Sequence, residues 1–208
     1  VERFRAVLNL VDIVRLDHFR GFAGYYEIPF GAKTAETGRW VPGPDHDFLR
    51  VLDEKLSDAR THEIDLPIIA EDLGEVTPAV RRLRDDFGLP GMRILQFAFG
   101  GDSRASEFLP HRYVPHTVAY TGTHDNDTFV GWFADEGSDG GPRSARQARK
   151  ERRAAVAYLG GPAARELGGD VHWAAIRALF ASVAQTVIVP LQDVLGLADS
   201  QRRGRLVQ

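Results

Sequence analysis

Short apolar segments that end in polar or acidic residues alternate with helical segments, and this alternation constrains the fold more than any other feature. Strands are expected at 11–17, 65–74, 92–99, 117–127 and 186–196. Apolar residues at helical spacing predict helices at 2–9, 47–59, 78–87, 144–159 and 171–185. Short continuous apolar strands are typical of a parallel sheet buried on both faces, and their alternation with helices indicates an α/β fold.

Local signals mark two further segments. Thr77 can cap a helix that has Pro78 in its first turn, and Gly88 with Pro90 ends it. Residues 22–45 are rich in glycine and proline and are expected to form one long loop. Long ordered loops in compact domains are usually functional, so this loop is a candidate part of a binding site.

Three carboxylates come at the ends of three of the predicted strands. Asp17 follows VDIVRL, Glu71 follows LPIIA and Asp125 follows TVAYTGTH. In a (β/α)8 barrel this end of the strands carries the active site. An open doubly wound sheet binds ligands at the same end, so position alone does not choose between the two folds. Each acid taken singly is more often a turn or helix-cap residue.

The residue types suit glycosyl chemistry. A retaining mechanism needs one ionised carboxylate as nucleophile and one protonated acid, roughly 5–5.5 Å apart. Arg15 is two residues before Asp17, so both side chains are expected on one face of the strand, where the guanidinium would favour an ionised Asp17. Glu71 follows an apolar strand, where desolvation would favour the protonated acid.

Composition and motifs argue against several other classes of function. The net charge of −3 gives no strong case for binding nucleic acid or an anionic membrane, and no apolar run approaches the roughly 18 residues of a membrane span. The chain has no cysteine, which removes disulfides, thiolate nucleophiles and cysteine-ligated zinc and is compatible with a reducing cytosol. His111 and His116 are five residues apart without an HExxH pattern, so no metal is expected. The basic cluster 143–153 is interpreted as the solvated face of a helix.

Several long blocks resemble a known enzyme family. The blocks are VRLDHFRGF at 14–22, the segment from IIAEDLGEV to RILQFAF at 68–99, YTGTHDNDT at 120–128 and VPLQDVLGL at 189–197. They resemble the amylomaltases, the 4-α-glucanotransferases of glycoside hydrolase family 77. The resemblance implies a (β/α)8 TIM barrel, of which this chain holds about five strands, the fourth to the eighth. Residues 1–197 are then the C-terminal portion of the catalytic barrel, and 198–208 form a divergent tail.

The resemblance implies a role for each matching residue. Asp17 matches the nucleophile, Glu71 the general acid/base, and Asp125 the third acid, which holds the distorted donor sugar. Arg15, His18 and His124 match residues around that sugar. Trp40, with Tyr25 and Tyr26, is a further candidate to stack on sugar rings. The aromatic residues Phe97, Phe99, Phe129 and Trp132 are expected in the core, and Asp72, Asn126 and Asp127 are expected to hold loops.

The family implies transfer of α-1,4-glucan segments to an acceptor glucose or glucan, without metal or organic cofactor. The expected partners are α-1,4-glucans and maltooligosaccharides in a cytoplasmic setting, not nucleic acid or membrane. The first three strands of the barrel are expected from sequence upstream of Val1, and this piece alone is expected to be poorly stable and inactive. Two alternatives remain open, a glucan-binding remnant without catalysis and a hydrolase of the wider amylase clan.

Overall fold

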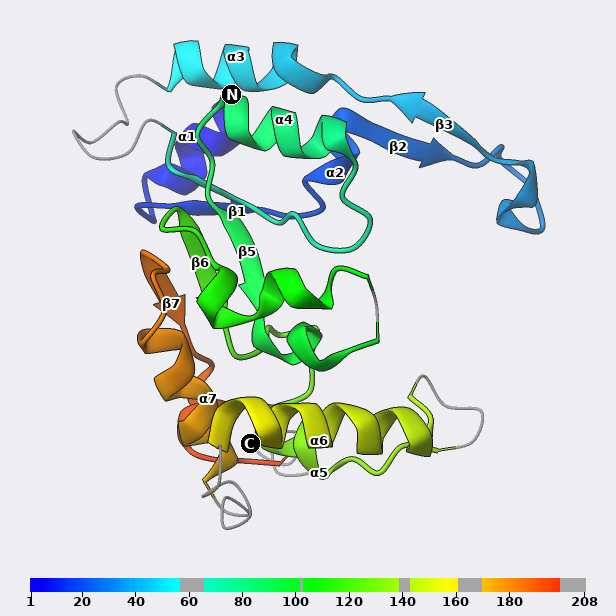
Figure 1. Ribbon diagram of the computed structural model, residues 1–208. Helices are drawn as coiled ribbons and strands as arrows, with labels where there is room; N and C mark the ends of the chain where they lie inside the picture. Colours follow the sequence, from blue (N-terminus) through cyan, green and yellow to red (C-terminus); the bar gives the residue numbers. More distant parts are fainter. Residues whose placement is uncertain (57–65, 102, 139–142, 161–169, 199–208) are drawn as a thin grey trace, which may run out of the picture. The chain divides into compact units, whose positions relative to one another are not determined.

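The computed structural model describes residues 1–56, 66–101, 103–138, 143–160 and 170–198 (Figure 1). The chain divides into two compact units, Val1–Met92 and Arg93–Gln208. The parallel sheet has five strands in the order β1-β4-β5-β6-β7. The expectation of an α/β chain with five parallel strands is therefore confirmed. No helix among the described residues is long and apolar enough to cross a bilayer.

Unit 1 is built around paired parallel strands. Its elements are α1 (Glu2–Leu8), β1 (Val14–Leu16), α2 (Arg20–Ala23), β2 (Gly24–Glu27), η1 (Ala35–Thr37), β3 (Arg39–Pro42), α3 (Asp45–Lys55), β4 (Ile68–Ala70) and α4 (Pro78–Asp86), followed by β5 (Gly91–Ile94), which holds residues of both units. β1 pairs with β4 in the register Val14↔Ile68 to Leu16↔Ala70, and β4 pairs with β5 at Ala70↔Gly91. Leucines 49, 52, 66, 83 and 89 pack with Ile68 and Phe19 in its core.

Helix α4 has the boundaries that its sequence signals predicted. The Thr77 hydroxyl accepts a hydrogen bond from the Val80 amide at 3.4 Å, and Pro78 is the first helical residue. Gly88 has a φ of +56°, a left-handed conformation that glycine adopts without a steric penalty. Cap, first turn and stop are all local properties of the chain, so they could be recognised without knowledge of its tertiary contacts.

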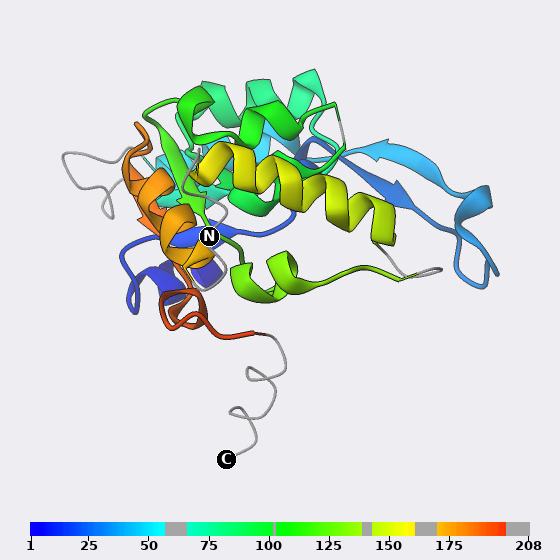
Figure 2. The same cartoon turned by 60° about the horizontal axis from the view of Figure 1, so that its bottom comes forward.

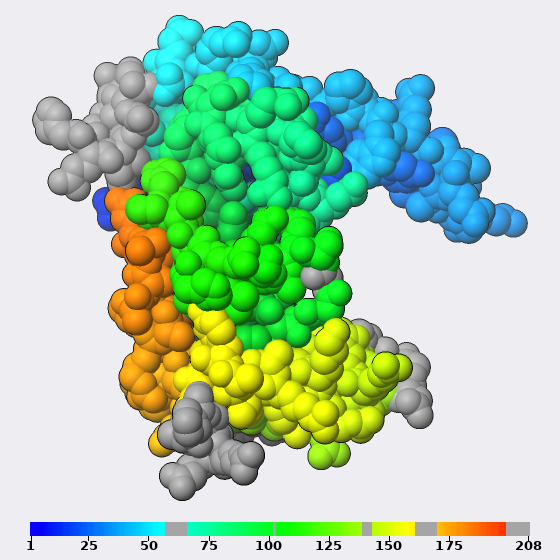
Figure 3. Space-filling model, in the orientation of Figure 1, coloured from blue at the N-terminus to red at the C-terminus, as the bar shows by residue number. Residues whose placement is uncertain are grey.

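The segment 22–45 is not one long loop, as was predicted, but contains an antiparallel hairpin. β2 and β3 pair in the register Gly24↔Pro42 to Glu27↔Arg39. Tyr26 and Trp40 face each other across the strands as an edge-to-face pair with ring centroids 5.3 Å apart. A Cβ at Gly38 would lie 2.3 Å from the Tyr26 ring, so the glycine is needed for this packing. The hairpin extends away from the helices of unit 1 (Figures 1 and 3).

Unit 2 contains the parallel pair of β6 and β7. Its elements after β5 are η3 (Leu95–Phe99), η4 (Ala105–Phe108), η5 (Pro110–Arg112), β6 (Thr117–Tyr120), α5 (Phe129–Ala134), α6 (Ala145–Gly160), α7 (Val171–Phe180), β7 (Thr186–Ile188) and α8 (Leu191–Val194). β6 and β7 pair from Val118↔Thr186 to Tyr120↔Ile188. The strand predicted at 92–99 ends at Ile94, because QFAF turns into a 3-10 helix.

The core of unit 2 lies between three helices and the strands. α5, α6 and α7 contribute Phe129, Trp132, Ala155, Ala175 and Leu179 to one buried cluster (Figures 1 and 2). Phe99, Phe129 and Trp132 are buried as predicted. The prediction is wrong for Phe97, which is 37% exposed and lines a cavity.

Candidate active site

Asp17 and Arg15 form an ion pair at the end of β1. Arg15 Nη2 lies 2.7 Å from Asp17 Oδ1, so the two side chains share one face, as their spacing predicted. Arg15 is largely covered, whereas the Asp17 side chain is 72% exposed. The guanidinium therefore sets the direction of a carboxylate that stays open to an incoming molecule.

Glu71 occupies the equivalent place on the neighbouring strand. The register Leu16↔Ala70 puts Asp17 and Glu71 each one residue beyond a paired strand end. The Glu71 amide donates to the Leu16 carbonyl at 3.1 Å, and the Phe19 amide donates to the Glu71 carbonyl at 3.2 Å. These backbone bonds hold the segments that carry the two acids side by side.

Both oxygens of the half-buried Glu71 carboxyl accept hydrogen bonds from backbone amides. Oε2 accepts from the His18 amide at 2.8 Å, and Oε1 accepts from the Leu73 amide at 3.0 Å. The side chain is thus fixed between the ends of β1 and β4. Each oxygen keeps a second lone pair, so the carboxyl can bind a further hydrogen-bond partner while both amide contacts remain.

His18 combines a strained backbone with this contact. Its φ is +49°, a left-handed conformation that costs a non-glycine residue about 1–2 kcal/mol. A Cβ at Gly21 would lie 3.1 Å from the His18 ring, so the small residue leaves room for the imidazole. Strain of this kind persists where the surroundings fix it, and here it adjoins both candidate acids of unit 1.

Trp40 lies on the hairpin, in contact with a cation. The Arg20 guanidinium carbon is 4.1 Å from the centre of the indole, and the ring remains half-exposed. Arg20 is in turn paired with Glu75 at 3.1 Å. The indole is therefore held at a defined angle by Tyr26 and Arg20 and keeps exposed apolar area, which suits stacking on a sugar.

Asp125 belongs to unit 2 and lies on the loop between β6 and α5. Its Oδ1 is 3.3 Å from His124 Nε2, and both side chains are about 70% exposed. Asn126 holds the turn by accepting from the amide and the hydroxyl of Thr123, each at 2.9 Å. The prediction that Asn126 holds a loop is confirmed.

Asp125 lines a cavity of about 1020 Å³ within unit 2. Phe97, Trp132 and Arg143 line it as well, together with Gln147 and other residues of α6. Ligand sites typically measure about 300–1000 Å³ and combine apolar walls with a few polar groups. The cavity is therefore large enough for a sugar ligand that contacts Asp125.

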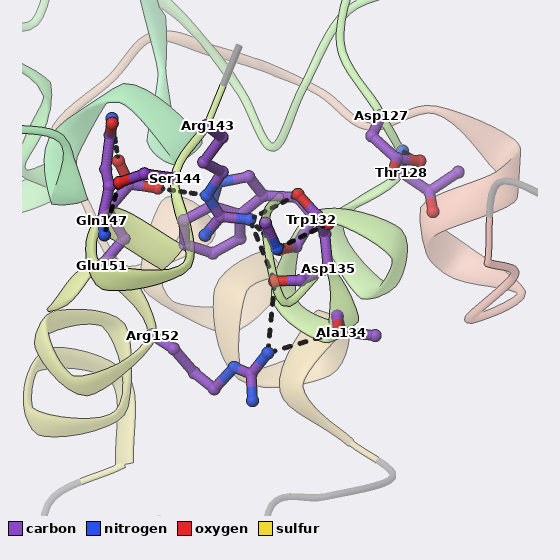
Figure 4. Close-up of polar contacts among 11 residues, drawn as sticks. Asp127, Thr128, Trp132, Ala134, Asp135, Arg143, Ser144, Gln147, Glu151 and Arg152 are labelled. Carbon is purple, nitrogen blue, oxygen red and sulfur yellow. Dashed lines mark hydrogen bonds and ion pairs between the residues drawn. The ribbon is translucent and has the colours of Figure 1, made fainter. Parts of the chain in front are cut away.

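Arg143 lines this cavity and is held in place by several polar contacts. Figure 4 shows these contacts. The Arg143 guanidinium bonds Glu151 Oε2 at 2.8 Å and the Trp132 carbonyl at 2.7 Å, and it lies over the Trp132 ring. The Gly137 amide and Arg143 together lower the pKa of Asp135, against a smaller effect of burial. The interpretation of 143–153 as a solvated face is wrong for Arg143, because long-range partners bury it.

The described residues gather the candidate groups at two places. Arg15, Asp17, His18 and Glu71 meet in unit 1, while His124 and Asp125 lie together in unit 2. In the part of the chain that the structure describes, no three histidine, aspartate or glutamate side chains form a group able to hold a metal ion. Sequence reasoning missed Asp193, a buried carboxylate on α8. An acid inside the apolar run PLQDVLGL was the available signal.

Comparisons with known proteins agree on one family. The glycoside hydrolase 77 model, described as 4-alpha-glucanotransferase, matches residues 1–203. The 4-alpha-glucanotransferases of Synechocystis and Thermus thermophilus are 45% and 42% identical to this chain, each over 97% of it. The solved amylomaltase of Streptococcus agalactiae in complex with acarbose superposes with a TM-score of 0.72 and 33% identity, over 93% of this chain and 35% of that one. The chain spans only about a third of the length of these curated relatives, 36% and 37%.

Proposed function

The chain belongs to the 4-alpha-glucanotransferase family, glycoside hydrolase family 77, and on that premise we propose that the protein carrying it transfers α-1,4-glucan segments to an acceptor glucose or glucan. The observation that carries the proposal is the register of β1 and β4. It supports a pair of carboxyl groups at neighbouring strand ends, which is the arrangement that a double displacement uses. Amylomaltases are TIM-barrel proteins, and residues 1–197 are proposed as a portion of such a barrel.

In the proposed reaction Asp17 is the nucleophile and Glu71 the acid and base. An Asp17 oxygen bonds to C1 of the donor glucose while the glycosidic bond breaks and Glu71 protonates the departing oxygen. Glu71, now ionised, then removes the proton from the acceptor 4-hydroxyl, whose oxygen displaces Asp17 from C1. The ion pair with Arg15 supports Asp17 as the charged member of the pair.

The remaining candidate residues are proposed to hold the sugars. Asp125 binds hydroxyls of the distorted donor ring, with His124 beside it at 3.3 Å. Arg15 and His18 line the donor position next to Asp17, and Trp40 stacks on a neighbouring glucose. The proposed steps are carried by these side chains and call on no metal or organic cofactor.

A glucan-binding protein without catalysis is the second candidate function. It is favoured by the two backbone amides that donate to the Glu71 oxygens, because such bonds hold the side chain in place between the two strand ends. The proposed substrates in both cases are α-1,4-glucans and not nucleic acid or membrane. We also propose a cytoplasmic location, with which the absence of cysteine from the sequence is compatible.

Products formed from maltotriose distinguish these functions. The native protein that carries this sequence is expected to convert maltotriose into a ladder of longer and shorter maltooligosaccharides. Asp17→Asn is expected to remove the ladder, whereas the control Asp47→Asn, at an exposed site on α3, is expected to keep it. Trp40→Ala is expected to lower the ratio of transfer to hydrolysis.

Each contrary outcome points to a different function. Glucose and maltose without longer products would indicate a hydrolase. Binding of acarbose without turnover would indicate the non-catalytic alternative. A ladder that survives Asp17→Asn would remove Asp17 from the mechanism.

A further inference from the structure

The Asp193 carboxylate joins the two ends of the loop that carries Asp125. Its side chain is buried, with a relative exposure of 1%, although it sits in the short helix α8. Oδ2 accepts from the Thr121 hydroxyl at 2.5 Å, and Oδ1 accepts from the Phe129 amide at 2.7 Å. Thr121 follows the last residue of β6, and Phe129 is the first residue of α5. One carboxylate therefore ties together both boundaries of the segment 122–128.

The wall of a second cavity shows that α8 and the loop face each other. This cavity of about 250 Å³ is lined by Thr123, His124 and Thr128 from the loop side, by Gln192 and Asp193 of α8, and by Pro190 just before it. The loop has one further anchor, because Gln96 Nε2 donates to the Asp127 carbonyl at 2.8 Å. Between these anchors the Asp125 side chain itself stays exposed.

A carboxylate is costly to bury unless its hydrogen bonds are well made, and both oxygens of Asp193 accept one. An apolar side chain of similar size would fill the space, but it could not accept from Thr121 and Phe129 at once. We propose that Asp193 is a positioning residue, which holds the loop so that Asp125 meets the donor sugar in one orientation.

This inference rests on the proposed function, because it assigns Asp193 to the reaction through Asp125. A displacement of about 1 Å at a reacting group can cost about a hundredfold in rate. Asp193→Asn keeps one acceptor oxygen and loses the other, so we expect kcat/KM for transfer to fall by roughly 10- to 100-fold. Thr121→Val removes only the hydroxyl donor and is expected to cause a smaller loss.

The test combines exchange with kinetics on the native protein that carries this sequence. Hydrogen exchange is expected to become faster in the peptide covering 121–129 of Asp193→Asn, while peptides of α4 are unchanged. In the background of Asp125→Asn, the added Asp193→Asn change is expected to have little further effect on transfer. Leu179→Ala is the control, because it removes a fully buried side chain of α7 in the same unit but takes away neither hydrogen bond of Asp193. It is expected to lower the thermal midpoint and leave kcat/KM and acarbose affinity unchanged.

The outcomes separate this inference from the proposed function. If exchange in 121–129 is unchanged in Asp193→Asn, Asp193 does not hold the loop and the inference is overturned. If the loop exchanges faster in Asp193→Asn but transfer and acarbose affinity are kept, the positioning role is overturned. It is also overturned if Asp193→Asn and Asp125→Asn reduce the rate of transfer multiplicatively. Full transfer by Asp125→Asn alone would instead refute the proposed role of Asp125, and the inference would fall with it.

Discussion

The two units hold their candidate acids in different ways. In unit 1, Asp17 and Glu71 directly follow paired strands, and backbone amides fix both oxygens of Glu71. In unit 2, Asp125 comes five residues after Tyr120, the last residue of β6, on a loop that is tied down at its ends. A residue next to a strand takes its position from the sheet. A residue on a loop depends on a few side-chain contacts from elsewhere in the chain.

A buried aspartate supports each arrangement, with different partners. Asp72 accepts from the Met92 amide at 2.8 Å and from Arg84 at 2.5 Å. Burial opposes the charge of Arg84, but the attraction of Asp72 outweighs it with help from Asp85 and raises the pKa of Arg84. Asp193 accepts instead from the uncharged Thr121 hydroxyl and the Phe129 amide. Asp72 thus joins α4 to β5, whereas the contacts of Asp193 join the two ends of a loop.

The largest expected effect comes from Glu71→Gln. A general acid contributes about 10²–10⁴ in rate, so transfer from a glucan donor should fall by about that factor. A donor with an activated leaving group such as 4-nitrophenolate needs less proton donation, so its first step should fall much less. Because Glu71 also acts as the base of the second step, single-turnover rates of donor cleavage check this, with Glu54→Gln at an exposed site as control. Equal losses with the two donors would contradict the role of Glu71.

The next largest effect concerns the buried pair in unit 1. Asp72→Ala leaves Arg84 and the Met92 amide without this acceptor, and breaking a buried ion pair costs about 3–5 kcal/mol. Because Arg84 keeps Asp85 as a partner, we expect a loss near 3 kcal/mol in the free energy of unfolding. Urea unfolding of Asp72→Ala, Arg84→Ala and the double variant would measure it. Additive losses would show that the two side chains are not coupled.

Two glycines allow a matched comparison of packing. A Cβ at Gly91 would lie 2.6 Å from an Asp72 oxygen, and a Cβ at Gly196 would lie 2.8 Å from the His172 ring. Gly196 also has a φ of +63°. Each alanine variant should lose about 1–3 kcal/mol in the free energy of unfolding, through crowding at Gly91 and through crowding with strain at Gly196. Thermal unfolding checks both, and a variant as stable as the parent would show that its neighbour can move away.

The smallest expected effect is a dependence of stability on pH. The hydrogen bond that His46 donates to Asp86 at 2.8 Å raises the pKa of His46, against an opposing effect of burial and with help from Asp45. A raised pKa in the folded state stabilises the fold fully below the unfolded value of about 6.5, and this contribution is lost as pH rises through the folded value. In the parent protein, this contribution should lower the denaturant midpoint as pH rises across this range. In His46→Gln and in Asp86→Asn this part of the decrease should be absent. An unchanged pH profile in both variants would contradict it.

The sequence predicted the features that depend on local patterns. Strand and helix segments, the Thr77 cap, and the Arg15–Asp17 pair followed from periodicity, helix signals and strand alternation. The hairpin in 22–45 was missed because its glycines and prolines are typical of loops, while its strands depend on the packing of Tyr26 against Trp40. The burial of Arg143 and Asp193 was missed because their partners are eight or more residues away in sequence. Local patterns contain no information about such contacts.

The central claim is that unit 1 supplies the nucleophile, and covalent trapping tests it most directly. A fluorinated maltosyl fluoride loses fluoride easily but leaves a glycosyl ester that is slow to break down, so the ester should accumulate. In the native protein that carries this sequence, peptide mass spectrometry should find the added sugar on Asp17. The label should be absent from Asp17→Asn and present in the control Asp47→Asn. A label on another carboxylate, or none in a protein that still transfers glucan, would contradict the claim.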